Sequence, residues 1–161
     1  YAVGLTRAAG VAQLLVVLAA VLIIQPVLAT VMGRSPRLTT ATVAVIAGLL
    51  WMLALCAGDA ISAAVGAYPR TITLILLPGF LGAGLLQLIT GVLHHLLPIL
   101  TGARPNTAER TGYARLLLIN LGGVLTLLGA TAAGLIMMGI GLAANVIAVG
   151  RANYLKKRLE S

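Results

Sequence analysis

The residues of this chain that could do chemistry are two adjacent histidines and one carboxylate, all placed within apolar sequence. His94 and His95 could bind a haem iron or a copper ion, and Asp59 could carry a proton or a cation. The alternative roles are structural. The imidazoles would then hold helices together, and Asp59 would pair with Arg7 or Arg70 at the outer surface.

The number of available ligands argues against a metal or haem site formed by this chain alone. A zinc site uses three or four N, S or O ligands, whereas the chain has two histidines and a single cysteine, Cys56. A bis-histidine haem needs its second histidine on another helix, and these two are adjacent. We therefore expect no cofactor of the chain's own, with haem or copper at His94 and His95 as the alternative.

Four polar side chains are expected to share one depth in a helical bundle. Gln25, His94, Asn120 and Asn145 each lie in the inner third of a predicted helix. Such a layer would conduct protons or ions, or it would simply join helices by hydrogen bonds. A stripe at three- and four-residue steps turns His94 toward the bundle and leaves His95 about 100° away. The stripe consists of Gly84, Gln87, Gly91, His94 and Pro98.

Five apolar segments position these side chains. Hydrophobic residues make up 60% of the chain and charged residues 9%, which excludes an ordinary soluble domain. Apolar runs of about 20 residues predict membrane-spanning helices. We predict an all-α, polytopic transmembrane bundle that forms one domain over residues 1–161. Its five helices are expected at roughly 9–32, 40–65, 71–100, 113–129 and 132–152.

The last apolar stretch is expected to turn back within residues 129–134. As one helix over 113–152 it would be roughly 60 Å long, about twice the hydrocarbon thickness. With the turn, two basic residues (Arg7 and Arg70) lie on one side of the membrane and nine on the other. The positive-inside rule then places the N-terminus outside and the C-terminus in the cytoplasm. The nine are Arg34, Arg37, Arg104, Arg110, Arg115, Arg151, Lys156, Lys157 and Arg158.

The basic residues flank apolar segments instead of forming one patch. The net charge of +8 therefore indicates membrane topology, and no nucleic-acid partner is expected. Lys156, Lys157 and Arg158 are predicted to bind anionic lipid headgroups. The expected partners are membrane lipids and either other membrane subunits or further copies of the chain, in the plasma membrane.

A segment over roughly residues 78–130 resembles the multi-helix membrane region of actinobacterial copper-oxidase and copper nitrite-reductase-like proteins. The similar sequence is GVLHHLLPILTG over 91–102, Arg104-Pro105, and then Arg115 and Asn120-Leu121-Gly122. In those proteins a Gly-rich helix ends in Leu-Leu-Pro and is followed by a Gly/Pro loop and a helix that carries Arg and Asn-Leu-Gly. This chain has no cupredoxin-type copper ligands. The resemblance therefore implies a bacterial respiratory or copper-linked membrane context and no activity of the chain itself.

Two functions are compatible with this sequence. The first is a non-catalytic anchor or scaffold in a respiratory or copper-linked redox complex, which the large Gly/Ala faces favour. The second is a proton- or ion-conducting, transport or haem-binding bundle that uses Asp59, Gln87 and the layer of His94, Asn120 and Asn145. A water-filled path from Asp59 to His94 would favour the second function, since a scaffold would fill that space with apolar side chains.

The predicted orientation is tested by labelling with a membrane-impermeant maleimide. In a Cys56→Ala background, we expect Thr131→Cys to react in intact cells, because residue 131 lies on the outer side. Asn106→Cys is the control and should react only after permeabilisation. The reverse pattern would show that the chain has the opposite orientation.

Overall fold

The computed structural model describes residues 2–34, 39–66, 69–101 and 111–159, and within these ranges it is helical with no strand. Three segments, α3, η1 and α4, follow one another without a break, so five helices are present, as predicted. The elements are α1 (Ala2–Arg34), α2 (Thr40–Ala64), α3 (Pro69–Gly79), the π-helix η1 (Phe80–Leu86), α4 (Gln87–Thr101), α5 (Gly112–Leu127) and α6 (Thr131–Leu159).

Four of the five helices are long and apolar enough to cross a membrane. These spans are Gly4–Pro26, Thr40–Ala64, Ile72–Leu96 and Thr131–Ala148. The exception is α5, whose 16 residues are about 24 Å long and therefore shorter than the hydrocarbon core. The chain is thus a membrane-embedded helical protein in which α5 is the short member.

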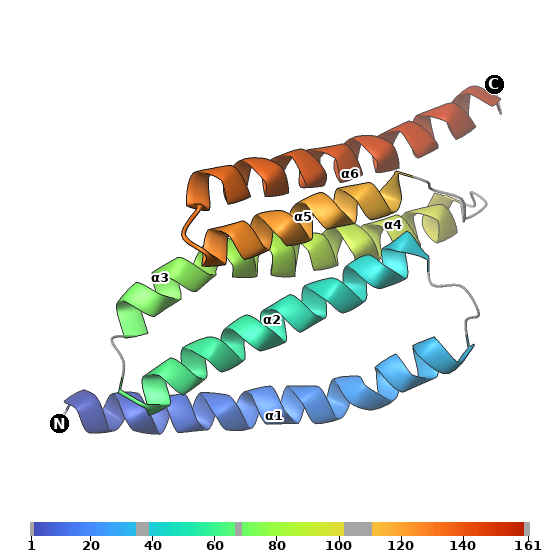
Figure 1. Cartoon of the computed structure of the whole chain (residues 1–161). Helices are drawn as coiled ribbons and strands as arrows, with labels where there is room; N and C mark the ends of the chain where they lie inside the picture. Colours follow the sequence, from blue (N-terminus) through green and yellow to red (C-terminus); the bar gives the residue numbers. More distant parts are fainter. Residues whose placement is uncertain (1, 35–38, 67–68, 102–110, 160–161) are drawn as a thin grey trace.

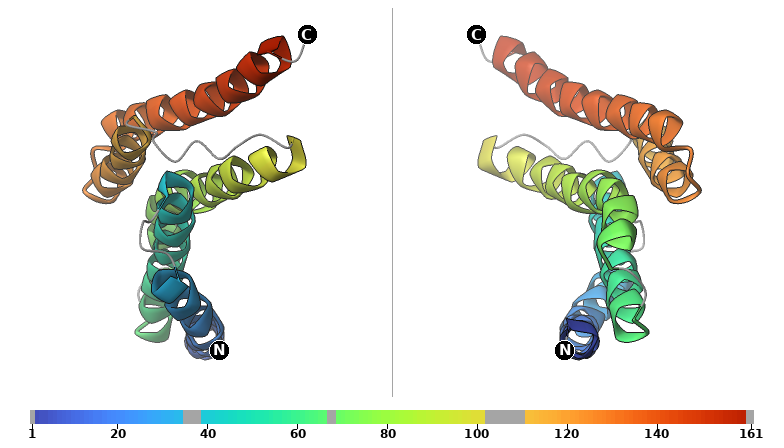
Figure 2. Two further views of the ribbon diagram at one scale, coloured as in Figure 1. Left: turned by 90° about the vertical axis from the view of Figure 1, so that its right-hand side faces the viewer. Right: turned by 90° about the vertical axis from the view of Figure 1, so that its left-hand side faces the viewer.

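The helices lie in an open row instead of a closed ring. The first helix, α1, lies at one edge of the row and packs chiefly on α2, and the hairpin of α5 and α6 lies at the other edge (Figures 1 and 2). The continuous helix of α3, η1 and α4 contacts α2 on one side and the hairpin on the other. Because the number of helices is odd, the two termini are at opposite ends of the molecule (Figure 1).

The row is held together at η1, where three consecutive small residues are buried. A Cβ built on Gly82 would lie 2.7 Å from the sulfur of Met138 on α6, and one on Gly84 would lie 2.9 Å from Cγ of Met52 on α2. Between them, Ala83 is fully buried and packs against Gly123 on α5. Thus η1 brings α2, α5 and α6 around one point, the kind of close approach by which membrane helices associate.

A proline just before η1 disturbs the backbone hydrogen bonds of the helix. Pro78 has no backbone N–H, so the carbonyl of Leu74 loses its usual i+4 donor. The following turns are wider, and at their end the backbone N–H of Gln87 donates to the carbonyls of Gly82 and Gly84. Such π segments are rare and are often found at functional sites. Nothing in the pattern of apolar residues predicted one here.

The predicted hairpin between the last two helices is confirmed, although its turn is shorter than expected. α5 ends at Leu127 and α6 begins at Thr131, so residues 131–134 are helical and do not belong to the turn. The chain reverses its direction at Gly129, whose φ is +88°. Residues with a Cβ rarely adopt this backbone conformation. The first and last helices, α1 and α6, are also longer than predicted, since a helix can continue into polar sequence beyond the apolar core.

The packing of α5 on α6 is tested by adding a single methyl group. A Cβ on Gly122 would lie 2.6 Å from the carbonyl oxygen of Gly134, a backbone atom that cannot move aside. We expect Gly122→Ala to lower the free energy of unfolding by about 1–3 kcal/mol, measured by thermal unfolding in detergent. Gly139→Ala on α6 is the matched control, because nothing lies within 4 Å of its Cβ position. Equal stability of the two variants would contradict this packing.

Candidate functional site

Asp59 on α2 is held by side chains from two neighbouring helices. Its Oδ1 accepts a 2.6 Å hydrogen bond from Thr73 Oγ1 on α3, and its Oδ2 accepts a 3.4 Å bond from Gln13 Nε2 on α1. Gln13 also donates to the carbonyl oxygen of Cys56 at 3.4 Å. These residues, which we call the Asp59 cluster, join three helices near one end of the bundle.

An ion pair with Arg7 or Arg70 was the structural alternative for Asp59, whose hydrogen bonds among the described residues come instead from Gln13 and Thr73. In the described part of the chain no ion pair joins Asp59 to Arg7. The Arg7 guanidinium lies instead beside Gly66, with Nε 3.2 Å from the position of a Cβ there. The side chain of Arg70 lies outside the described residues. Neutral hydroxyl and amide donors can hold a carboxylate without the cost of dehydrating a second charge.

A second polar contact joins α2 to α5. The indole Nε1 of Trp51 donates a 2.6 Å hydrogen bond to Asn120 Oδ1, and Asn120 Nδ2 donates at 2.6 Å to the carbonyl of Leu116 on its own helix. Both ends of the Asn120 amide are therefore satisfied. Trp51 also packs against the apolar core of Ala83, Ile119 and Met138.

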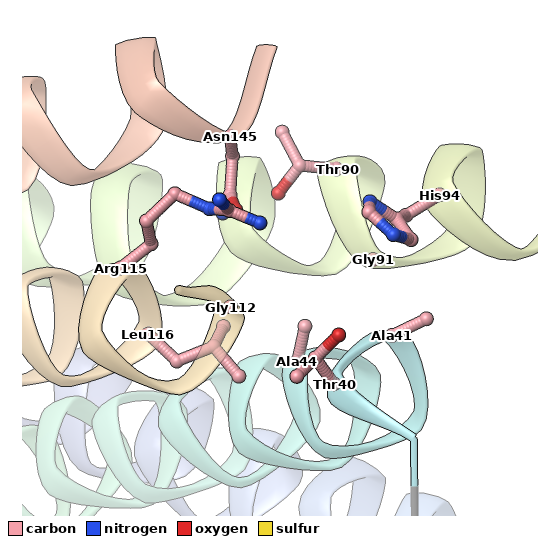
Figure 3. A pocket seen from close by; sticks show the side chains of 10 residues that line it. All are labelled: Thr40, Ala41, Ala44, Thr90, Gly91, His94, Gly112, Arg115, Leu116 and Asn145. Carbon is pink, nitrogen blue, oxygen red and sulfur yellow. The ribbon is translucent and has the colours of Figure 1, made fainter. Parts of the chain in front are cut away.

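A pocket lies at the opposite end of α2 from the Asp59 cluster (Figure 3). Its volume is about 240 Å³ including the open mouth, and the enclosed part has room for roughly one water-sized molecule. We call it the Arg115 pocket. Side chains and backbone from α2, α4, α5 and α6 line it: Thr40, Ala41, Ala44, Thr90, Gly91, His94, Gly112, Arg115, Leu116 and Asn145.

Arg115 carries a permanent charge and is nevertheless only 7% exposed. Its Nε donates to Asn145 Oδ1 on α6 at 2.8 Å, and its Nη1 donates to Thr111 Oγ1 at 2.8 Å. A guanidinium has five N–H donors in a planar fork, enough to hold these acceptors and an anionic oxygen together. Asn145 is likewise buried, with 8% of its surface exposed.

The predicted layer of Gln25, His94, Asn120 and Asn145 is not formed as one group. His94 and Asn145 line the same pocket, whereas Asn120 is bonded to Trp51. Gln25 is exposed on α1, a helix that packs chiefly on α2. A helix at the edge of the row turns most of its surface to lipid, so an equal depth does not bring Gln25 to the other three residues.

The two histidines have different surroundings. His94 points into the Arg115 pocket (Figure 3), whereas the side chain of His95 is exposed. Within the described ranges, no three His, Cys, Asp or Glu side chains are close enough to hold a metal ion. The side chains of Lys156, Lys157 and Arg158, predicted to bind lipid headgroups, lie outside the described residues.

Gln87 is completely buried, and neither polar atom of its side chain has a hydrogen-bond partner among the described residues. Its backbone carbonyl accepts a 3.0 Å bond from Thr90 Oγ1 one turn later. Burial of an amide without partners costs about 1–3 kcal/mol. Gln87 directly follows η1, so an unfavourable polar side chain and an unusual backbone occur together in the core.

Three residues that join helices did not stand out in the sequence: Gln13, Trp51 and Arg115. Arg115 was interpreted as a charge on the cytoplasmic side and as part of the sequence resemblance, without a role in joining helices. A signal for its burial exists, because it belongs to the stripe of Gly112, Arg115, Ile119 and Gly122 at three- and four-residue steps. Gln13 could have been found as an amide within an apolar run that spans the membrane.

No protein family, curated protein or solved structure matches this chain. Its chemistry is therefore deduced from its own residues. The Asp59 cluster presents a carboxylate at one end of the bundle, and the Arg115 pocket presents basic and hydrogen-bond-donating groups at the other.

The energetic cost of the unpartnered Gln87 amide is tested by replacing Gln87 with an apolar side chain of similar size. We expect Gln87→Leu to raise the free energy of unfolding by about 1 kcal/mol or more, because the penalty of the unpartnered amide is removed. Gln25→Leu makes the same chemical change at an exposed position and should have little effect. Thermal unfolding in detergent compares the two. A loss of stability in Gln87→Leu alone would show that this amide is hydrogen-bonded in the membrane.

Proposed function

We propose that the chain is a non-catalytic anchor or scaffold that packs within a larger membrane complex. The sequence resemblance favours a respiratory or copper-linked redox complex, located in the plasma membrane. In this role the chain contributes a rigid apolar body and leaves the reaction to its partners. The partners are other membrane subunits or further copies of this chain.

The packing between the two polar ends carries this proposal. Ala44 in the Arg115 pocket and Asp59 are separated by about 22 Å of helix. The space between them is occupied by a close-packed apolar core of Ala83, Ile119 and Met138, against which Trp51 and Leu142 pack. A scaffold needs such a core, whereas a conducting bundle needs a chain of polar groups or water across it.

Hydrogen bonding within the bundle also supports a scaffold. The carboxylate of Asp59, the amide of Asn120 and the guanidinium of Arg115 each bond to a side chain on another helix. Each bond joins one particular pair of helices and so fixes their positions. A bond of this kind contributes about 0.6 kcal/mol in a membrane, so several of them together favour one arrangement of helices.

One observation favours the conducting alternative. Gln87 is polar, unpartnered and buried in the core, close in sequence to the π segment. An amide in this position could relay a hydrogen bond between the Asp59 cluster and the Arg115 pocket. The alternative therefore predicts transport that depends on Asp59.

The two functions are separated by proton flux into liposomes that contain a pH-sensitive dye. With a membrane potential applied, we expect the purified chain to give no flux above that of protein-free liposomes, and Asp59→Asn to change nothing. The physical reason is the apolar core of Ala83, Ile119 and Met138 that lies between the two polar ends. A flux that Asp59→Asn abolishes would establish conduction and refute the scaffold.

The location of the redox cofactor needs a separate test, which uses the complex isolated in mild detergent. Visible haem or copper absorbance should belong to the partner chains and should persist when His94 and His95 are both replaced by leucine. Loss of the absorbance in that double variant would assign the cofactor to this chain.

A further inference from the structure

We propose that the Arg115 pocket binds a phosphate group, supplied by an anionic phospholipid of the adjoining leaflet. Two helices begin at this pocket: Thr40 and Ala41 open α2, and Gly112 opens α5. A helix N-terminus carries a partial positive charge and N–H groups without intrahelical acceptors. Two such ends beside one cavity favour an anion.

The N-cap side chain of α5 does not cap the first turn of its helix. Thr111 occupies the N-cap position, but its side chain makes no capping hydrogen bond. Its hydroxyl oxygen accepts instead from Arg115 Nη1. The contact draws the guanidinium across the beginning of the helix and adds a full positive charge to the partial one.

Three side chains from three helices complete the set of donors. Arg115, His94 and Asn145 point into the same space (Figure 3). The Oδ1 of Asn145 accepts from Arg115 Nε, so Nδ2 is the group that Asn145 can offer to a ligand. An imidazole, an amide and a guanidinium together can donate to several oxygens of one phosphate.

The depth of the pocket indicates a lipid as the source of the phosphate. Thr40 is the first residue of α2, whose 25 residues are about 37 Å long and therefore extend beyond a hydrocarbon core of about 30 Å. The pocket lies at this end of α2 and is therefore at the level of the headgroups. Basic pockets between helices at this level bind anionic headgroups in other membrane proteins.

The size of the pocket fits this mode of binding. The enclosed space holds roughly one water-sized group, which corresponds to one phosphate oxygen. The remaining oxygens and the glycerol would stay at the open mouth. A lipid could bind in this way without leaving its leaflet.

The experiment titrates the full chain in dodecyl maltoside, a detergent with a sugar headgroup, and records the midpoint of thermal unfolding. Phosphatidylglycerol is the probe, diacylglycerol is the lipid without phosphate, and inorganic phosphate is the free anion. A ligand that binds only the folded state raises the midpoint with its concentration. We expect a rise with phosphatidylglycerol, none with diacylglycerol, and a weaker rise or none with inorganic phosphate.

Two histidine variants form a matched pair. His94→Leu should need about tenfold more phosphatidylglycerol for the same rise, as expected for the loss of one hydrogen bond to a charged group. His95→Leu changes the adjacent, exposed histidine and should respond like the wild type. Lipid bound by Lys156, Lys157 and Arg158 affects both variants equally, so it cannot produce the difference.

Asn145→Asp separates binding from folding. A carboxylate at this position can still accept from Arg115 Nε, so the variant should remain folded. It replaces an N–H donor with a negative charge, so the response to phosphatidylglycerol should be lost. Equal responses of the wild type, His94→Leu and Asn145→Asp would overturn the proposal. An equal rise with diacylglycerol would do the same, and a response to inorganic phosphate alone would overturn the lipid source.

Discussion

Close approach of helix backbones is the constraint on which this structure depends. Apolar side chains gain little by leaving lipid for protein, so helices in a membrane associate through tight packing and a few hydrogen bonds. In this chain η1 provides that packing, because Gly82, Ala83 and Gly84 are all buried and contact three different helices. The position of η1 between α2 and the α5–α6 hairpin lets each of the three residues face a different helix.

The polar side chains determine which helices become neighbours. Asp59 joins α2 to α1 and α3, Trp51 joins α2 to α5, and Arg115 joins α5 to α6. Each contact is worth little on its own in a membrane, but the contacts connect the open row from one edge to the other. Gln87 is different, since it lies in the same core without a described partner. The described part of the bundle is therefore closely packed, although the buried side chain of Gln87 is left unsatisfied in it.

The direction of the helices gives the bundle two chemically different ends. α2 and α5 start at the same end, so their positive N-termini lie beside Arg115 and His94 in one pocket. The carboxylate of Asp59 lies near the other end, toward the C-terminus of α2. The apolar core of Ala83, Ile119 and Met138 lies between these two ends. An apolar body with a basic, donor-rich pocket at one end is suited to anchoring among anionic lipids.

Several features of this protein were determined by the sequence alone. Apolar runs of membrane length must satisfy their backbone groups internally, which predicts helices. The length of residues 113–152 together with the distribution of basic residues predicts a hairpin, and the stripe through Gly91 separates His94 from His95. The tertiary structure alone decided that Asn145 meets Arg115, that Asn120 meets Trp51 and that Gln25 remains at the edge. The physical reason is that these helices are apolar on nearly every face. Their rotation and order therefore depend on which small residues permit close contact. Close contact is a property of a pair of helices and cannot be read from one helix alone.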